Sequence, residues 1–156
     1  MTRVAEARRG VLAAVDRLVN AEPSLEEVLR RTAELLHDTF DPYTWVGIYL
    51  VDGDELALAA WRGPAPTAHV RIPVGTGICG TAAQSGRTLV VDDVSQEPTY
   101  LACFPSTRSE IVVPILVRDS VVGELDVDGD EVAAFGPADR AFLEQIARML
   151  SSRFPH

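Results

Sequence analysis

Apolar side chains recur at helical spacing through the first forty residues. The recurrence predicts a helix over residues 3–20 and, after a break at Pro23, a second helix that ends near Asp41. Ser24 and Glu27 form the sequence pattern of a capping box at the start of the second helix. The apolar positions of the first helix include Val4, Val11, Val15 and Leu18.

The pattern changes between residues 43 and 128, where β-branched and aromatic residues form short runs bounded by turn residues. A short helix is predicted from Gly77 to Ser85, and residues 92–108 are predicted to form a long polar loop with a helical turn. Pro137 stands at the first position of a last helix. The predicted strands are 43–50, 55–62, 69–72, 88–91, 109–117 and 121–128.

Helices at both ends with hairpins between them are typical of an α+β fold. We expect a central antiparallel sheet flanked by N- and C-terminal helices, at about 3–40 and 137–153, with sheet and pocket at about 43–128. A chain of 156 residues fits a single domain, which we place at 1–156. The wide apolar faces of the terminal helices favour a homodimer.

Charge narrows the range of partners. The chain has 14 basic and 23 acidic residues, a net charge of −9, which disfavours binding to nucleic acid or to an anionic membrane. All the basic residues are arginines, so lysine-based Schiff-base chemistry and a P-loop are excluded. Neither a membrane-spanning run nor a secretory leader is visible, so we expect a cytoplasmic protein. The histidines, His37, His69 and His156, have no spacing typical of zinc sites, and we expect neither a metal nor a cofactor.

An acidic strand late in the chain is the first candidate for chemistry. Glu124, Asp126 and Asp128 are spaced by two residues, so their side chains share one face of a strand. Pairing within the hairpin predicts that Glu110 faces Asp128. Crowded carboxylates in a pocket cannot all ionise, so one would keep its proton and act as an acid while others would bind an ammonium group. A solvated outer face is the alternative interpretation.

The register of that hairpin depends on the length of its turn. If the loop is residues 118–120, Val117 lies opposite Val121 and Val112 faces Asp126. The face then mixes apolar and acidic residues, which is more typical of a pocket wall than of an outer surface. A shorter turn would shift the register by one residue.

The chain has two cysteines, Cys79 and Cys103. Cys79 lies near the start of the predicted helix 77–85, where backbone amides and the helix dipole would lower the pKa of its thiol. Cys103 lies in the long polar segment, where a thiol can be exposed and can move. Two reactive thiols are one interpretation, and two ordinary buried cysteines are the other.

Other features are less specific. Residues 75–80 match the dinucleotide-binding pattern G-x-G-x-x-G, but no parallel βαβ unit surrounds them. Trp45 and Tyr49 alternate on one predicted strand with Gly47 between them, either as core residues or as the lining of a pocket. A lone histidine such as His69 is usually structural or on the surface, with heme ligation as a minor alternative.

Several segments together resemble the GAF domain family, and within it the free methionine-(R)-sulfoxide reductases. The resemblance runs from about residue 45 to residue 128. It implies a GAF/PAS-like sheet and an enzyme that reduces the free amino acid. The segments that carry it are 45–49, 71–73, 77–82, 93–94, 102–103, 109–114 and 123–128.

The resemblance implies a thiol cycle. Cys103 would attack the sulfoxide sulfur and become a sulfenic acid, Cys79 would close a disulfide with it, and thioredoxin would reopen the disulfide. It also implies a set of substrate-binding residues. The carboxylates of that set would hold the sulfoxide oxygen and the substrate amine, and its aromatic residues would line the methyl-thioether side. The set is Glu110, Asp126, Asp128, Trp45 and Tyr49.

Two departures from the family affect this assignment. The best-known members have a third cysteine at the position of His69, so here Cys79 or a small external thiol must resolve the sulfenic acid, and His69 becomes a possible site residue. The family also has Asp directly after the nucleophile, where this chain has Phe104. A two-cysteine reductase and a relative that kept the pocket for another task both fit these residues.

A GAF domain without catalytic activity, which binds a small molecule and signals through its terminal helices, is the alternative function. The Asn-Lys-Phe-Asp-Glu signature of cyclic-nucleotide-binding members is absent. Neither cysteine is followed by histidine, which disfavours bilin attachment. The joint presence of both cysteines and the carboxylates favours the reductase.

Overall fold

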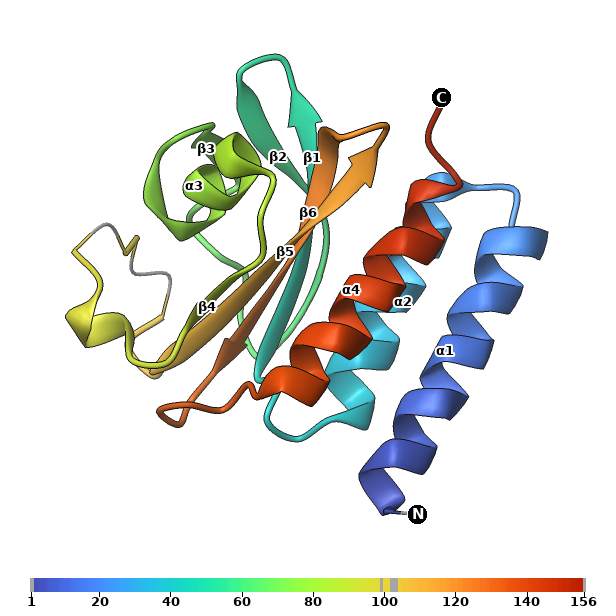
Figure 1. Ribbon diagram of the computed structural model, residues 1–156, viewed down its shortest axis with the longest axis horizontal. Coiled ribbons are helices and arrows are strands. Elements are labelled where there is room, and N and C mark those ends of the chain that lie inside the picture. The colour runs from blue at the N-terminus through green and yellow to red at the C-terminus, as the bar shows by residue number, and fades with distance from the viewer. Residues whose placement is uncertain (1, 99, 102–103, 156) are drawn as a thin grey trace.

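The protein forms one six-stranded antiparallel sheet with helices on both sides, as the computed structural model shows for residues 2–98, 100–101 and 104–155 (Figure 1). The strand order is β3-β2-β1-β6-β5-β4. This arrangement is the α+β fold that the sequence predicted. The elements are α1 (Arg3–Ala21), α2 (Leu25–Thr39), β1 (Trp45–Asp52), β2 (Glu55–Arg62), β3 (Arg71–Pro73), α3 (Gly77–Ser85), β4 (Leu89–Val91), a 3₁₀ turn (Val94–Gln96), β5 (Ser109–Val117), β6 (Ser120–Gly129) and α4 (Pro137–Ser151).

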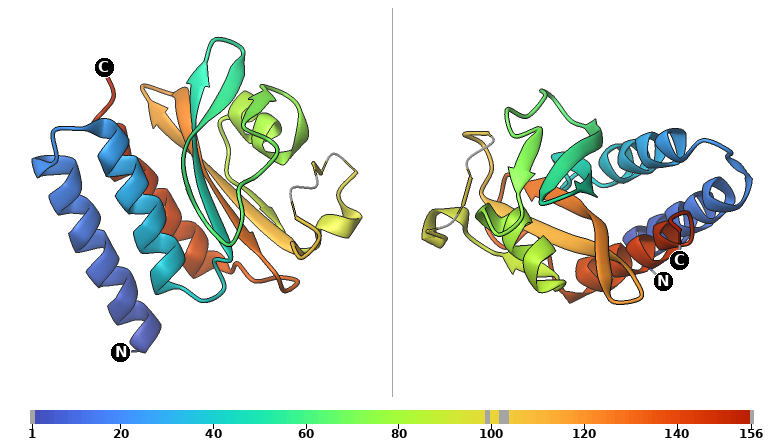
Figure 2. Two further views of the ribbon diagram at one scale, coloured as in Figure 1. Left: turned by 180° about the vertical axis from the view of Figure 1, so that it is seen from behind. Right: turned by 90° about the horizontal axis from the view of Figure 1, so that it is seen from above.

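The sheet separates two unequal layers. The long helices α2 and α4 lie against one face, and α1 lies outside them, as two further views make clear (Figure 2). The short helix α3 covers part of the other face, over β5 and β6. The segment between β4 and β5 lies on the same side as α3. The two faces of the sheet therefore meet different surroundings.

Alternation along the central strands divides their side chains between these layers. The face toward the long helices is apolar throughout and forms the main core. The opposite face combines a smaller apolar cluster, around Tyr49, Leu56 and Val112, with acidic side chains. The main-core residues of the sheet include Val46, Ile48, Ile111, Val113, Leu125 and Val127.

Local signals place the helix starts where the sequence predicts them. Thr2 and Ser24 accept hydrogen bonds from the backbone N–H groups of Ala5 and Glu27, at 3.0 and 3.2 Å. The capping box expected at Ser24 is only half formed, because its own N–H donates to Glu22 Oε1 at 3.1 Å rather than to Glu27. The carboxylate of Glu22, which precedes the helix, thus takes the place of the predicted carboxylate of Glu27.

The β5–β6 hairpin reaches the predicted register near its acidic end by an unpredicted route. Its turn has two central residues, Arg118 and Asp119, both with positive φ, so Val117 pairs with Ser120 and not with Val121. A bulge between Ile115 and Leu116 then shifts the pairing by one residue. The two deviations cancel. Glu110 accordingly faces Asp128, and Val112 faces Asp126, as predicted.

The predicted strand at 69–72 is shorter in the structure and begins at Arg71. The residues before it form a loop held by side chains. The N–H of His69 donates to Thr67 Oγ1 at 3.0 Å, and the hydroxyl of Tyr49 donates to the carbonyl of His69 at 2.8 Å. Of the predicted residues before Arg71, Val70 still accepts a hydrogen bond from the N–H of Leu58 in β2, at 2.9 Å.

The apolar faces of the terminal helices are largely used within the chain. Val11, Val15 and Leu18 of α1 are buried, whereas Val4 is 49% exposed. The homodimer stays a prediction, and these faces alone do not support it, because they are mostly buried within the chain. Within the described residues, no helix combines the length and the apolar character needed to cross a bilayer.

Candidate active site

Four carboxylates and one thiol are buried together beneath α3. The acidic alternation of β6 places Glu124, Asp126 and Asp128 on the face away from the long helices, and β5 adds Glu110 to the same face. Cys79 enters from the first turn of α3. All five side chains are less than a tenth exposed. The solvated outer face that the sequence left open does not occur.

Crowding and burial alter the protonation of this cluster. Burial raises the pKa of Asp126, and a hydrogen bond with Glu110 opposes that rise. Burial and then the charge of Asp126 raise the pKa of Asp128, against the hydroxyl of Thr107, which donates to Asp128 Oδ2 at 3.3 Å. Carboxyl groups with raised pKa values hold protons that a ligand could receive.

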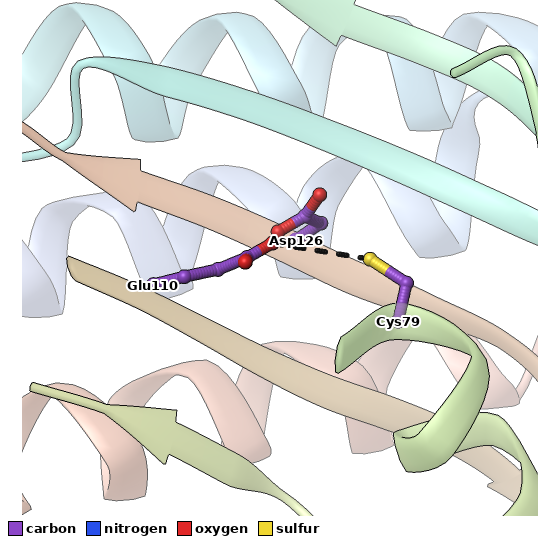
Figure 3. A group of neighbouring side chains, drawn as sticks. All are labelled: Cys79, Glu110 and Asp126. Atoms are coloured by element: carbon purple, nitrogen blue, oxygen red, sulfur yellow. Dashed lines mark hydrogen bonds between the residues drawn. The ribbon is translucent and has the colours of Figure 1, made fainter. Parts of the chain in front are cut away.

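Cys79 is a buried thiol among negative charges. Its Sγ donates to Oε2 of Glu110 at 3.9 Å, the contact drawn as a dashed line (Figure 3). Burial, and then the charges of Asp126, Glu124 and Glu110, raise the pKa of the thiol. The sequence-based expectation of a lowered pKa at the helix start is wrong, because burial and nearby carboxylates outweigh one short helix dipole.

Glu124 is the least satisfied member of the cluster. Its side chain is 0% exposed, and neither carboxylate oxygen has a hydrogen-bond partner among the described residues. Burial, followed by the charge of Asp126, raises its pKa, while the thiol of Cys79 opposes the rise. Strand alternation predicts Glu124 on this face, but the family resemblance does not include it among the substrate-binding residues. Its complete burial depends on α3, which strand alternation cannot reveal.

An aromatic wall borders the acidic cluster. Trp45 and Tyr49 lie opposite Asp128 and Glu124 in the β1–β6 pairing, so they share the pocket face. The indole of Trp45 is 2% exposed, and its Nε1 donates to the carbonyl of Ala65 at 3.1 Å. The two aromatic residues predicted as candidate lining thus belong to the same face as the carboxylates.

Two glycines make room for the indole of Trp45. A Cβ at Gly47 or at Gly63 would come within 2.4 Å of its ring atoms. Trp61 stacks on Trp45 with ring centroids 6.4 Å apart and an interplanar angle of 11°. Phe104 contacts Trp45 with centroids 5.7 Å apart and an angle of 46°. The sequence shows Gly47 between Trp45 and Tyr49 but predicts neither ring contact.

Two of the predicted site residues contribute less to this picture. His69 is half-buried, and its backbone carbonyl and N–H hydrogen-bond to Tyr49 and Thr67. Cys103, the predicted nucleophile, lies outside the described residues. The structure therefore brings together six of the eight predicted site residues, namely Cys79, Glu110, Asp126, Asp128, Trp45 and Tyr49.

Cys79, Glu110 and Asp126 are also the described residues best placed to hold a cation. One ligand atom from each lies within 4.8 Å of the others. A structural zinc site has four protein ligands, and no fourth described residue joins the set at that distance. The raised pKa values of Cys79 and Asp126 favour a second use of the same groups, which is proton donation.

The cavity at these groups is nearly closed. It measures about 10 Å³ and is lined by Ile72, Ile78, Cys79, Leu101, Glu110 and Asp126. That volume is about what one water needs. Two larger hollows of about 700 and 740 Å³ lie elsewhere on the surface, and neither is lined by a cysteine or by the buried carboxylates. A ligand the size of an amino acid must therefore displace residues of the small cavity to enter.

Comparisons with known proteins agree with the geometry. A model of the GAF domain matches residues 24–154. The chain is 35% identical over 133 residues to the free methionine-R-sulfoxide reductase of Escherichia coli, covering 85% of this chain and 79% of that protein. It is 37% identical over 148 residues to GAF domain-containing protein A of Dictyostelium discoideum, covering 94% and 92%.

A solved structure is similar over almost the whole chain. The free methionine-R-sulfoxide reductase of Neisseria meningitidis, in complex with its substrate, superposes with a TM-score of 0.91 at 39% identity. The match covers 99% of this chain and 92% of that one.

Proposed function

The chain belongs to the GAF domain family, and within that family we propose that it is an oxidoreductase that reduces free L-methionine-(R)-sulfoxide to methionine. The observation that carries the proposal is the group of four buried carboxylates, three of which act on the thiol of Cys79. The relatives from Escherichia coli and Neisseria meningitidis, named for this activity, support it.

The carboxylates suit a zwitterionic sulfoxide. An ammonium group would be held by Asp126 and Asp128, because its positive charge would lower the raised pKa values of these carboxyls and favour their ionised forms. A protonated carboxyl, for which we propose Glu110, would donate to the sulfoxide oxygen and make the sulfur electrophilic. Trp45 and Tyr49 would contact the methyl-thioether end. Charge recognition and acid catalysis thus come from one group of side chains.

The proposed reaction begins at Cys103. Its sulfur attacks the sulfoxide sulfur while a carboxyl proton passes to the sulfoxide oxygen. The oxygen is transferred to Cys103, methionine leaves with its sulfur reduced by two electrons, and Cys103 becomes a sulfenic acid. The proton lost by the Cys103 thiol restores the carboxyl. Atoms and charge balance without a metal or an organic cofactor.

Cys79 is the proposed resolving thiol. Its sulfur forms a disulfide with Cys103, and the hydroxyl of the sulfenic acid leaves as water with the Cys79 proton. A dithiol such as thioredoxin then reduces the disulfide and returns both cysteines to thiols. The buried thiol of Cys79 must become accessible for this exchange, which agrees with the need for the small cavity to open for substrate.

Turnover of the two sulfoxide epimers tests the proposal. We expect consumption of NADPH with free L-methionine-(R)-sulfoxide, thioredoxin and thioredoxin reductase, and none with the (S) epimer. Cys103→Ser is the matched control and should abolish turnover. Cys79→Ser should release one methionine per chain and then stop with thioredoxin, because no thiol of the chain remains to resolve the sulfenic acid.

Two outcomes would reject the reductase. One is the absence of turnover with either thioredoxin or dithiothreitol. The other is full activity of Cys103→Ser. Binding of a small amino acid without turnover would instead favour the signalling GAF domain.

A further inference from the structure

Phe104 has no role in the proposed reaction. It belongs to no helix or strand, yet its ring lies 5.7 Å from that of Trp45. Trp45 is itself rigidly placed, between Gly47 and Gly63 and with its indole N–H bonded to the main chain. Phe104 therefore rests on a fixed surface that borders the acidic cluster.

The main chain fixes Phe104 from a second direction. Its carbonyl accepts a hydrogen bond from the N–H of Thr107 at 3.2 Å, closing a turn with Pro105 in its second position. The hydroxyl of Thr107 then reaches Asp128 at 3.3 Å. The turn thus joins Phe104 to the end of β6, where one of the buried carboxylates lies.

The chain is also attached to the site before Cys103. Leu101 lines the small cavity together with Cys79, Glu110 and Asp126. Anchored residues therefore precede and follow the proposed nucleophile in the sequence. Cys103 is bonded directly to Phe104, and the Cα atoms of two neighbouring residues lie at most about 3.8 Å apart.

We propose that Phe104 is a positioning residue: by docking on Trp45 it limits how far its neighbour in the chain, Cys103, can move from the aromatic wall that borders the carboxylates. This inference rests on the proposed function, in which Cys103 is the nucleophile and Trp45 contacts the methyl-thioether end of the substrate. Phe104 itself touches neither reacting atom. It acts by limiting where the neighbouring cysteine can go, which raises the fraction of encounters in attack geometry.

Kinetics of Phe104→Ala and Phe104→Tyr test this role. We expect Phe104→Ala to lower kcat on the order of 100-fold, the effect of a displacement of about 1 Å between reacting groups. KM should change much less, because the carboxylates remain. Phe104→Tyr keeps the ring and should recover most of the rate. Phe154→Ala, which removes another half-buried ring packed against the helices, controls for general loss of packing.

Fluorescence gives a readout that does not depend on turnover. The chain has two tryptophans, Trp45 and Trp61, and they stack on each other beside Phe104. Phe104→Ala should shift their emission to longer wavelength and increase quenching by acrylamide, because it uncovers an indole that is 2% exposed. Phe104→Tyr and Phe154→Ala should leave both properties near the wild-type values.

The kinetic and fluorescence measurements together distinguish failure of this inference from failure of the proposed function. An inactive wild-type protein rejects the reductase, and fluorescence then still reports whether Phe104 docks on Trp45. An active wild type whose Phe104→Ala variant keeps its kcat overturns the inference. A loss of kcat that Phe104→Tyr fails to recover, or that Phe154→Ala reproduces, overturns it as well. If Phe104→Ala does not fold, Phe104→Leu replaces it in the same comparison.

Discussion

The thiol of Cys79 and the carboxylate of Glu110 meet between α3 and β5, with Sγ donating to Oε2 at 3.9 Å. In the proposed reaction this sulfur must become a thiolate, and the contact places it beside an acid. Since Asp126 and Glu124 add further negative charge to the same environment, the resting protein holds Cys79 as a neutral thiol. Its reactivity is therefore suppressed until the site changes.

Alkylation of Cys79 measures that suppression. In a Cys103→Ser background, iodoacetamide should modify folded Cys79 far more slowly than the same cysteine in urea. Each unit by which the pKa is raised removes about tenfold of the thiolate at a given pH, and burial limits access further. Mass spectrometry of the Cys79 peptide across a pH series gives the rates. Folded and unfolded rates that agree near pH 8 would contradict the buried thiol.

Glu124 should make stability depend on pH. At low pH the folded and unfolded chains both hold its proton. As the pH rises past the ordinary glutamate pKa of about 4.5, the unfolded chain releases the proton and the folded chain keeps it, because burial raises the folded pKa. The carboxyl therefore lowers the free energy of unfolding progressively between acid and neutral pH.

Glu124→Gln removes this contribution. We expect the free energy of unfolding to rise near pH 7 by about 1.4 kcal/mol for each unit by which burial raises the pKa of Glu124, and to change little near pH 4, where the folded and unfolded chains both hold the proton. Denaturant titrations at several pH values measure both effects. Glu26→Gln, which removes an exposed carboxyl from α2, controls for the change in net charge. A gain that is equal at both pH values would mean that protonation of Glu124 is not the cause.

The space beside Trp45 predicts a steric effect. A Cβ at residue 47 would lie 2.4 Å from Cη2 and Cζ3 of the indole, so Gly47→Ala must displace the ring. Overpacking of this kind costs about 1–3 kcal/mol, and it moves the surface on which Phe104 and the proposed substrate rest. We expect a lower melting temperature, an altered tryptophan emission and a raised KM.

Gly10→Ala is the matched control for Gly47→Ala. Gly10 lies within α1, and a Cβ there meets nothing within 4 Å. The substitution should stabilise the helix by up to about 1 kcal/mol through helix propensity and leave the kinetics unchanged. If Gly47→Ala behaves like Gly10→Ala, the indole is not confined as the structure indicates.

Much of the fold was predictable because it depends on local signals. Alternation in β6 placed the acidic residues on one face, and capping and proline signals located the helices. The pairing of Glu110 with Asp128 was predicted for an incomplete reason, since neither the two-residue turn nor the bulge is encoded in a recognisable pattern. The predicted pairing near the site is nevertheless correct, because only this register keeps one face of the sheet apolar.

The chemistry of the site was less predictable because it depends on contacts between distant segments. Burial and the carboxylates of β5 and β6 raise the pKa of Cys79. A rule about helix starts takes no account of these neighbours. The contact between Trp45 and Phe104 joins β1 to a loop before β5. One sequence shows that both rings exist but not that they touch.

The proposed binding of the substrate amine by Asp128 predicts a change in selectivity. The wild type should prefer free methionine sulfoxide to its N-acetyl derivative, which has no ammonium group. A hydrogen bond to a charged group contributes about 1.5–3 kcal/mol, which corresponds to a roughly 10- to 100-fold effect on kcat/KM. Asp128→Asn should lower kcat/KM for the free amino acid by this factor and leave the slower reaction of the N-acetyl compound nearly unchanged.

Asp130→Asn is the control for that variant, because it makes the same charge change at an exposed position two residues away. It should keep the wild-type preference. The kinetic pattern also separates the two possible roles of Asp128. A residue that only supports the fold would reduce both substrates alike, whereas a residue that holds the ammonium group alters the ratio between them. Equal losses for both compounds in Asp128→Asn would therefore remove Asp128 from the amine site and leave Asp126 as the carboxylate to examine.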